Sequence, residues 1–175
     1  MLCTPERSPI SARRGRSWIS PSPARSPPTW SRRPCAGGVE KAAAKFASAK
    51  LKALDKCVNR VFACEDTKPP GGECAAAVAP KCAKDVAVID KAHLKLRDTI
   101  DAKCGAVPLG VLRTADALNL DAAQVDCGTI ATLADYEECL FLQHSCRVEL
   151  MLATDVPLAQ ELLGSVGVTI APACL

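Results

Sequence analysis

The hydrophobic positions between Val39 and Cys64 recur at intervals of three and four residues. The segment, VEKAAAKFASAKLKALDKCVNRVFAC, contains no Gly or Pro and is rich in Ala, Lys and Leu, which are strong helix formers. The apolar positions with this spacing are Val39, Ala43, Phe46, Ala53, Leu54, Cys57, Val61 and Cys64. The lysines on another side of the same helix are Lys41, Lys45, Lys52 and Lys56. The pattern predicts a long amphipathic helix.

A turn and a second helix follow this segment. Pro-Pro-Gly-Gly at residues 69–72 ends any helix. A second helical pattern runs from about Glu73 to Lys103 and allows a kink at Pro80. Gly105 then occupies the position typical of a helix stop. Long helices joined by a tight turn predict an antiparallel helical hairpin.

The last third of the chain is less regular. Residues 105–130 have mixed periodicity, which predicts short helices and loops. Thr132 and Asp135 form a capping-box-like start for a helix that extends to about Leu152. Pro157 begins a last short helix that ends before Gly164. We expect this smaller C-terminal helical part to pack on the hairpin.

The cysteine content indicates how the core of this protein is stabilised. Aromatic residues make up only 3% of the chain, so the hydrophobic core is small and needs further stabilisation. Eleven of the 175 residues are cysteines, which can supply that stabilisation as disulfides. None forms a CxxC pair, which removes the signature of zinc ribbons, thioredoxin-like sites and c-type haem attachment. We favour a disulfide framework, and hence an exported protein in an oxidising compartment. Buried free thiols in a cytosolic helical protein are the alternative.

Six of the cysteines are placed symmetrically about the predicted turn, and residues equidistant from the turn face each other in an antiparallel helix pair. The pairs with this property, each centred on Pro69 or Pro70, are Cys35–Cys104, Cys57–Cys82 and Cys64–Cys74. In each helix, 22 residues separate the outer cysteine from the middle one, which is about six whole turns. The spacing predicts three nested disulfides, each stabilising by about 2–4 kcal/mol.

The remaining cysteines are harder to pair. Cys139 and Cys146 lie two turns apart on one predicted helix, about 10 Å, which is too far for a disulfide. The chain from Cys127 folds back to Cys139 more easily than to Cys146. This favours the pairs Cys127–Cys139 and Cys146–Cys174, and it leaves Cys3 unpaired.

Residues 1–34 differ in composition from the rest of the chain. They are rich in Arg, Ser and Pro, so we predict a disordered tail. ARRGRSWI resembles a twin-arginine export signal, but the hydrophobic segment that should follow is missing. We favour a wrongly assigned start or a frameshift that removed the true signal peptide. We expect no transmembrane segment, because no stretch is long and apolar enough.

Charge is unevenly distributed along the chain. Residues 1–38 carry a net charge of +6, residues 39–104 carry +4 and residues 105–175 carry −7. The halves of the folded part therefore attract each other. We expect no nucleic-acid partner, because the aromatic residues that stack on bases are nearly absent.

The nested cysteines and two longer stretches of the sequence resemble those of known classes of protein. In architecture alone, the hairpin resembles the disulfide-bridged coiled-coil-helix proteins with twin cysteine-x9-cysteine motifs, whereas the spacings here are x6 and x7. CAGGVEKAAAKFASAKLKALDKC and ADYEECLFLQHSCR are similar to uncharacterised cysteine-rich secreted bacterial proteins. This similarity covers most of residues 35–165, places Cys35 inside the domain and implies no particular activity. The missing signal peptide departs from that pattern.

The stretch CLFLQHSC holds the strongest candidates for chemistry. His144 with a free Cys146 or Cys139 would form a metal or haem site. The stretch also resembles the helix of secreted phospholipases, in which a cysteine-framed His is followed by Asp. Here Ser145 replaces that Asp, and no glycine-rich calcium loop precedes it. The interpretation we favour is a partly exposed helical His between disulfide anchors.

Other catalytic signatures are missing from the sequence. LLGSVG differs from the GxSxG motif of hydrolases because Leu163 occupies the first glycine position. There is no P-loop and no dinucleotide-binding fingerprint. His93 lies among charged residues of the second predicted helix and is expected at the surface. We therefore expect no cofactor and no catalytic activity.

The sequence thus predicts an all-α protein in three parts: a tail (1–34), a long antiparallel helical hairpin stapled by nested disulfides (35–104), and an acidic C-terminal helical subdomain packed on it (105–175). We expect a periplasmic or secreted protein with a structural or binding role. The alternatives are a metal- or haem-binding protein using His144 and nearby Cys, and a hydrolase at the same helix. The side chains through which a protein or an acidic polymer would bind are Lys41, Lys45, Lys52 and Lys56.

Overall fold

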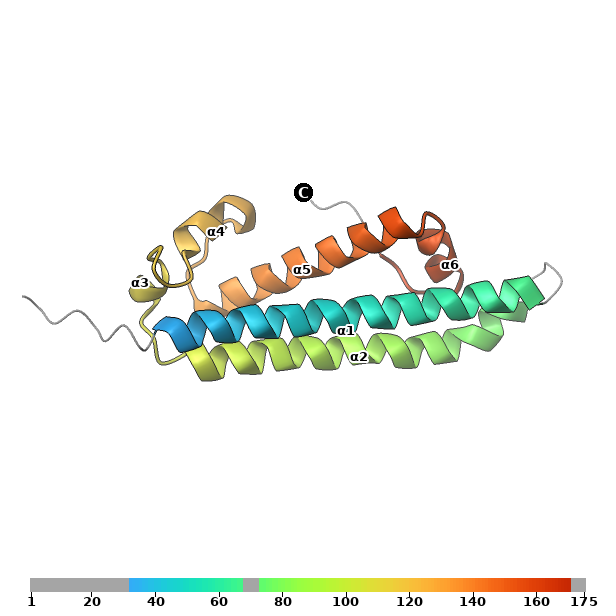
Figure 1. Cartoon of the computed structure of the whole chain (residues 1–175), viewed down its shortest axis with the longest axis horizontal. Coiled ribbons are helices and arrows are strands. Elements are labelled where there is room, and N and C mark those ends of the chain that lie inside the picture. The colour runs from blue at the N-terminus through green and yellow to red at the C-terminus, as the bar shows by residue number, and fades with distance from the viewer. Residues whose placement is uncertain (1–31, 68–72, 171–175) are drawn as a thin grey trace, which may run out of the picture.

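The computed structural model describes residues 32–67 and 73–170, and the predictions for residues 1–31, 68–72 and 171–175 lie outside this part of the chain. Within it, the secondary structure is helical and contains no strand. Two long helices lie side by side, and a third long helix runs along them (Figure 1). The predicted all-α fold is confirmed.

The hairpin consists of α1 (Arg32–Thr67) and α2 (Glu73–Cys104). The first helix begins before Cys35, and Pro80 lies inside α2 on its exposed side. The apolar positions that the sequence assigns to the inner face of α1 are buried, with Cys64 partly so. The structure thus has the long amphipathic helix and the antiparallel hairpin that the hydrophobic spacing predicts.

Three nested disulfides join α1 to α2 in the predicted order. The Cα–Cα distances are 4.9 Å for Cys35–Cys104, 5.1 Å for Cys57–Cys82 and 5.7 Å for Cys64–Cys74. These distances lie within the range that a disulfide spans. Nested disulfides of this kind indicate an oxidising environment, because cytosolic reductants keep such thiols reduced.

The C-terminal part contains α3 (Leu109–Leu112), α4 (Leu120–Cys127), α5 (Leu133–Asp155) and α6 (Ala159–Ser165). The predicted capping box begins α5: the Thr132 side chain accepts from the Asp135 backbone N–H, and the Asp135 carboxylate accepts from the Thr132 backbone N–H. The prediction for the last helix was wrong at both ends. It begins at Ala159 rather than Pro157 and runs through Gly164, because a single glycine weakens a helix without ending it.

A fourth disulfide fixes α4 to α5. It joins Cys127 to Cys139, with a Cα–Cα distance of 5.5 Å, as the sequence predicts. Cys146 is disulfide-bonded as well. Its predicted partner, Cys174, and the unpaired Cys3 lie outside the described residues, so the pair Cys146–Cys174 stays a prediction.

The core is divided into two clusters along the hairpin. One surrounds the Cys57–Cys82 disulfide and includes residues of α5 and α6. The other surrounds Cys35–Cys104 and includes residues from α3, α4 and the start of α5. Each cluster contains a fully buried disulfide, which supplements the few aromatic side chains. The C-terminal part therefore packs on the hairpin at both ends, as Figure 1 also shows.

Candidate functional site

The two cysteines of the predicted metal or haem site at the α5 helix, Cys139 and Cys146, are both disulfide-bonded. The sulfur of Cys146 is bound in a disulfide and is not a thiolate ligand in this state. His144 is half-buried, and burial, followed by the charge of Arg147, lowers the pKa of its imidazole. In residues 32–67 and 73–170, no three or more His, Cys, Asp or Glu side chains are arranged to hold a metal ion.

The interface between the hairpin and α5 contains polar groups between the two core clusters. His93, which was expected at the surface, is partly buried. Its ring stacks on Phe141 of α5 at a centroid distance of 3.7 Å, and its Nε2 atom is buried without a hydrogen-bond partner among the described residues. The side chain is drawn inward because α5 covers this face of α2. A charged sequence neighbourhood gives no signal of that contact.

Ion pairs complete this interface. Lys50 of α1 binds Glu149 of α5, and both side chains are largely buried. Arg97 of α2 lies 3.4 Å from a carboxylate oxygen of Glu137, a residue that is 1% exposed. These pairs connect the basic hairpin to the acidic part, in agreement with the charge distribution along the chain. The residues of this interface form a structural contact between α5 and the hairpin.

The buried Glu137 carboxyl makes a testable contribution to stability. Burial raises its pKa above the ordinary value of 4.5, and the charge of Asp101 raises it further, against the lowering effect of Arg97. Protonation of Glu137 therefore favours the folded state. Its stabilising contribution is complete below pH 4.5 and is lost as pH rises through the folded-state pKa.

We expect the Glu137→Gln variant to flatten the pH dependence of the melting temperature in that window, since the amide cannot ionise but can still accept from Arg97. Thermal unfolding followed by circular dichroism across the window measures this. The exposed neighbour Glu138 offers a matched control, because Glu138→Gln should leave the slope as it is. An equal slope in wild type and Glu137→Gln would contradict the assignment.

A groove lies between α1 and α2, and we call it the hairpin groove. Its volume is about 610 Å³, and its lining residues all come from these two helices. Apolar side chains of the groove include Ala42, Phe46, Ala49, Ala92, Leu96 and Ala102. The lysines that line it are Lys45, Lys91, Lys95 and Lys103. Asp98 is the acidic residue of the lining.

Contacts at both ends of the hairpin set the register of this groove. Near the open end, the Lys103 side chain passes so close to Gly38 that a Cβ atom there would lie 2.9 Å from its Cγ. Toward the turn, Lys56 of α1 lies 3.3 Å from the Asp85 carboxylate of α2. Antiparallel positions between these contacts face each other in the same register, which places Lys45 of α1 across from Lys95 of α2.

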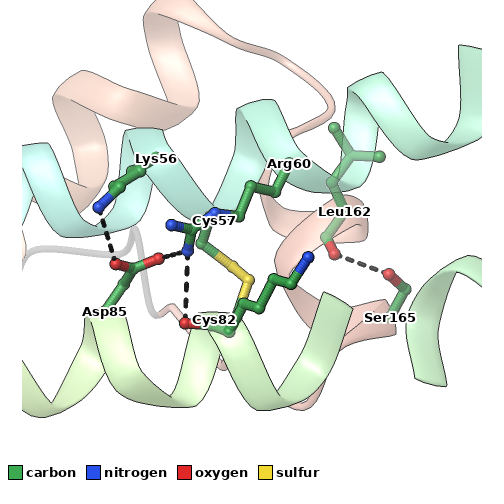
Figure 2. Close-up of a disulfide and its surroundings, with 8 residues drawn as sticks. Lys56, Cys57, Arg60, Cys82, Asp85, Leu162 and Ser165 are labelled. Carbon is green, nitrogen blue, oxygen red and sulfur yellow. Dashed lines mark hydrogen bonds and ion pairs between the residues drawn. A yellow bond between two sulfur atoms is a disulfide. The ribbon is translucent and has the colours of Figure 1, made fainter. Parts of the chain in front are cut away.

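The positive side chains of α1 near the turn are paired with an acidic residue of α2, whereas the lysines of the hairpin groove are not. Asp85 binds both Lys56 and Arg60, next to the Cys57–Cys82 disulfide (Figure 2). Arg60 also donates to the Lys81 carbonyl oxygen at 3.4 Å. Within the described chain, by contrast, the groove lysines form no ion pair. With four lysines and one aspartate in its lining, the groove therefore presents a net positive charge above an apolar floor.

The four lysines predicted to form one binding face lie in different environments in the structure. Lys41, Lys45, Lys52 and Lys56 are all exposed, but Lys45 is the member that lines the groove, and Lys56 is bound to Asp85. Sequence reasoning did not single out Lys91, Lys95 and Lys103 of α2. Their three-four spacing with Ala92, Leu96 and Thr99 was the available signal.

The chain matches none of the protein-family models, curated proteins or solved structures with which it was compared. Its function is therefore inferred from its own residues. Within the described ranges, no helix combines the length and the apolar run that a membrane crossing requires.

Proposed function

We propose that this protein is a non-catalytic, exported binding protein of bacterial type that holds an anionic partner in the hairpin groove. The observation that carries the proposal is the set of groove lysines without ion pairs. The disulfides support a periplasmic or secreted location, where they persist. The resemblance to cysteine-rich secreted bacterial proteins agrees with that location.

The energetics of the lysines favour a partner of opposite charge. Lys91 and Lys95 lie four residues apart on α2, and like charges at this spacing destabilise a helix by about 0.2–0.5 kcal/mol. Lys45 adds a third positive charge from across the groove. An anionic ligand offsets this repulsion. The disulfides hold α1 and α2 in fixed register, so the lysines are positioned before the ligand arrives and less entropy is lost on binding.

The proposal predicts that reversing charge in the groove abolishes most of the binding to an acidic polymer. We expect Lys45→Glu/Lys95→Glu to bind fluorescent polyglutamate at least about tenfold more weakly than wild type at low salt, because like charges then face each other. Fluorescence anisotropy measures the affinity, and circular dichroism verifies that each variant is folded.

The matched control is Lys41→Glu/Lys84→Glu, which changes the net charge equally at exposed positions that do not line the groove. We expect it to weaken binding by less than about threefold, through the long-range field alone. Equal losses in the two double variants would show that net charge, and not the groove, attracts the polymer. Undetectable binding by wild type would refute the proposed function.

A further inference from the structure

The hairpin groove has an apolar floor that an acidic polymer does not need. Phe46 and Leu96 close its bottom and are each 1% exposed. Ala49 and Ala92 leave space above them because their side chains are short. Val88 lies at one end and remains 47% exposed. Covering apolar surface is favourable, so the ligand that fits best has an apolar part as well as a negative charge.

The dimensions of the groove suit one hydrocarbon chain. Its lining runs along α2 from Val88 to Lys103, which is about 22 Å of helix. One acyl chain spans half of the hydrocarbon thickness of a bilayer, about 15 Å, which leaves room for a headgroup. The volume of about 610 Å³ also falls in the range of roughly 300–1,000 Å³ that is typical of small-molecule sites.

Three of the four groove lysines lie in the part of the groove away from Val88, together with the single acidic residue of the lining, Asp98, whereas Lys91 lies one turn from Val88. Lys95 and Lys103 flank Thr99 on α2, and Lys45 lies opposite on α1. Lysine side chains suit such a site, because their methylene stems cover apolar surface while the ammonium groups stay in water. We propose that the groove binds a monomeric, single-chain amphiphile with an anionic headgroup, with the headgroup near these lysines and the chain directed toward Val88.

This proposal rests on the proposed function and narrows its ligand class to long-chain carboxylates and similar single-chain anions. An acidic amphipathic helix is the competing occupant. A helix is about 10–12 Å wide and binds by inserting large apolar anchors into pockets. Four of the apolar lining residues are alanines, Ala42, Ala49, Ala92 and Ala102, and a lining of short side chains suits a narrow hydrocarbon chain better than a helix.

The first test uses the unmodified protein and needs no variant. Hexanoate, octanoate, decanoate and dodecanoate, each below its micellar concentration, are titrated by isothermal calorimetry. We expect the affinity to rise about fourfold for each added methylene, which corresponds to about 0.8 kcal/mol per buried methylene. Dodecanol should bind at least tenfold more weakly than dodecanoate because it lacks the charge. Affinity that does not depend on chain length would overturn the proposal.

The second test fills the groove. Ala92→Phe places a ring over the floor, whereas Ala87→Phe adds the same ring at an exposed α2 position outside the lining. We expect Ala92→Phe to weaken dodecanoate binding at least tenfold and Ala87→Phe to leave it within about twofold. Thermal unfolding verifies both folds. Equal affinity of the two variants for dodecanoate would overturn the proposal, and if Ala92→Phe does not fold, the chain-length series decides.

Binding measurements with three other ligands distinguish this proposal from the proposed function. Binding of polyglutamate by the groove lysines together with no binding of dodecanoate would leave the proposed function intact and refute the amphiphile. Binding to vesicles of anionic lipid without binding to monomeric dodecanoate would assign the groove to a membrane surface instead. Tight binding of an acidic amphipathic peptide, with none of dodecanoate, would assign it to a helix.

Discussion

Removing the outermost disulfide, with Cys35→Ala/Cys104→Ala, is expected to destabilise the protein by at least about 4 kcal/mol. This bond closes the longest loop of the ladder, with a sequence separation of 69 residues, and a longer loop removes more entropy from the unfolded chain. Both cysteines are at most 1% exposed and pack in the core cluster at the open end of the hairpin. Urea unfolding of the oxidised proteins measures the difference.

The innermost disulfide is the matched control. Cys64–Cys74 has a sequence separation of 10 residues, and its cysteines are only partly buried. We expect Cys64→Ala/Cys74→Ala to destabilise by about 3 kcal/mol or less. If the inner pair contributes as much as the outer pair, or more, loop closure and burial do not determine the order of stabilisation along the ladder.

The Glu149→Ala variant is expected to destabilise the fold by about 3 kcal/mol, because it removes a carboxylate from a largely buried ion pair and leaves the Lys50 ammonium without it. The pair lies where α5 meets the hairpin, so its loss should also loosen α5. Chemical denaturation measures the loss, and hydrogen exchange along α5 shows whether that helix is released. A loss below about 1 kcal/mol would place this pair with ordinary surface pairs.

Two further variants separate burial from charge. Lys50→Met/Glu149→Leu replaces both ions with apolar side chains and should recover most of the stability lost in Glu149→Ala, because no buried charge remains. Arg113 and Asp121 form a pair at 2.7 Å in which the Asp121 side chain is exposed. Asp121→Ala should therefore change stability by about 1 kcal/mol or less.

The hairpin and its disulfides could be predicted from the sequence because their signals are local. The three-four spacing of apolar residues specifies one buried face for each helix, and the prolines and glycines at 69–72 specify the turn between them. Once the turn is known, antiparallel packing alone brings Cys35 to Cys104. The capping box at Thr132 is equally local. The end of α6 was missed because Gly164 alone does not determine where a helix stops.

The binding surface could be predicted only in part. Lys45 was in the predicted lysine face, but its companions in the groove, Lys95 and Lys103, come from α2. The sequence marks them as polar positions of a helix and does not say which face of the hairpin they share with α1. The face on which these lysines lie depends on how each helix is rotated about its own axis, and the packing of α1 against α2 determines that rotation.

The sequence by itself therefore determined the helical class, the hairpin and its cysteine ladder, because each follows from periodicity and from distance to one turn. Only the tertiary structure decided which charged groups are buried and which face solvent. Lys50, His93 and Glu137 are covered because α5 lies over one face of the hairpin. The groove lysines remain exposed because the described C-terminal helices leave their face open. These outcomes depend on contacts between residues far apart in the chain, which no local pattern encodes.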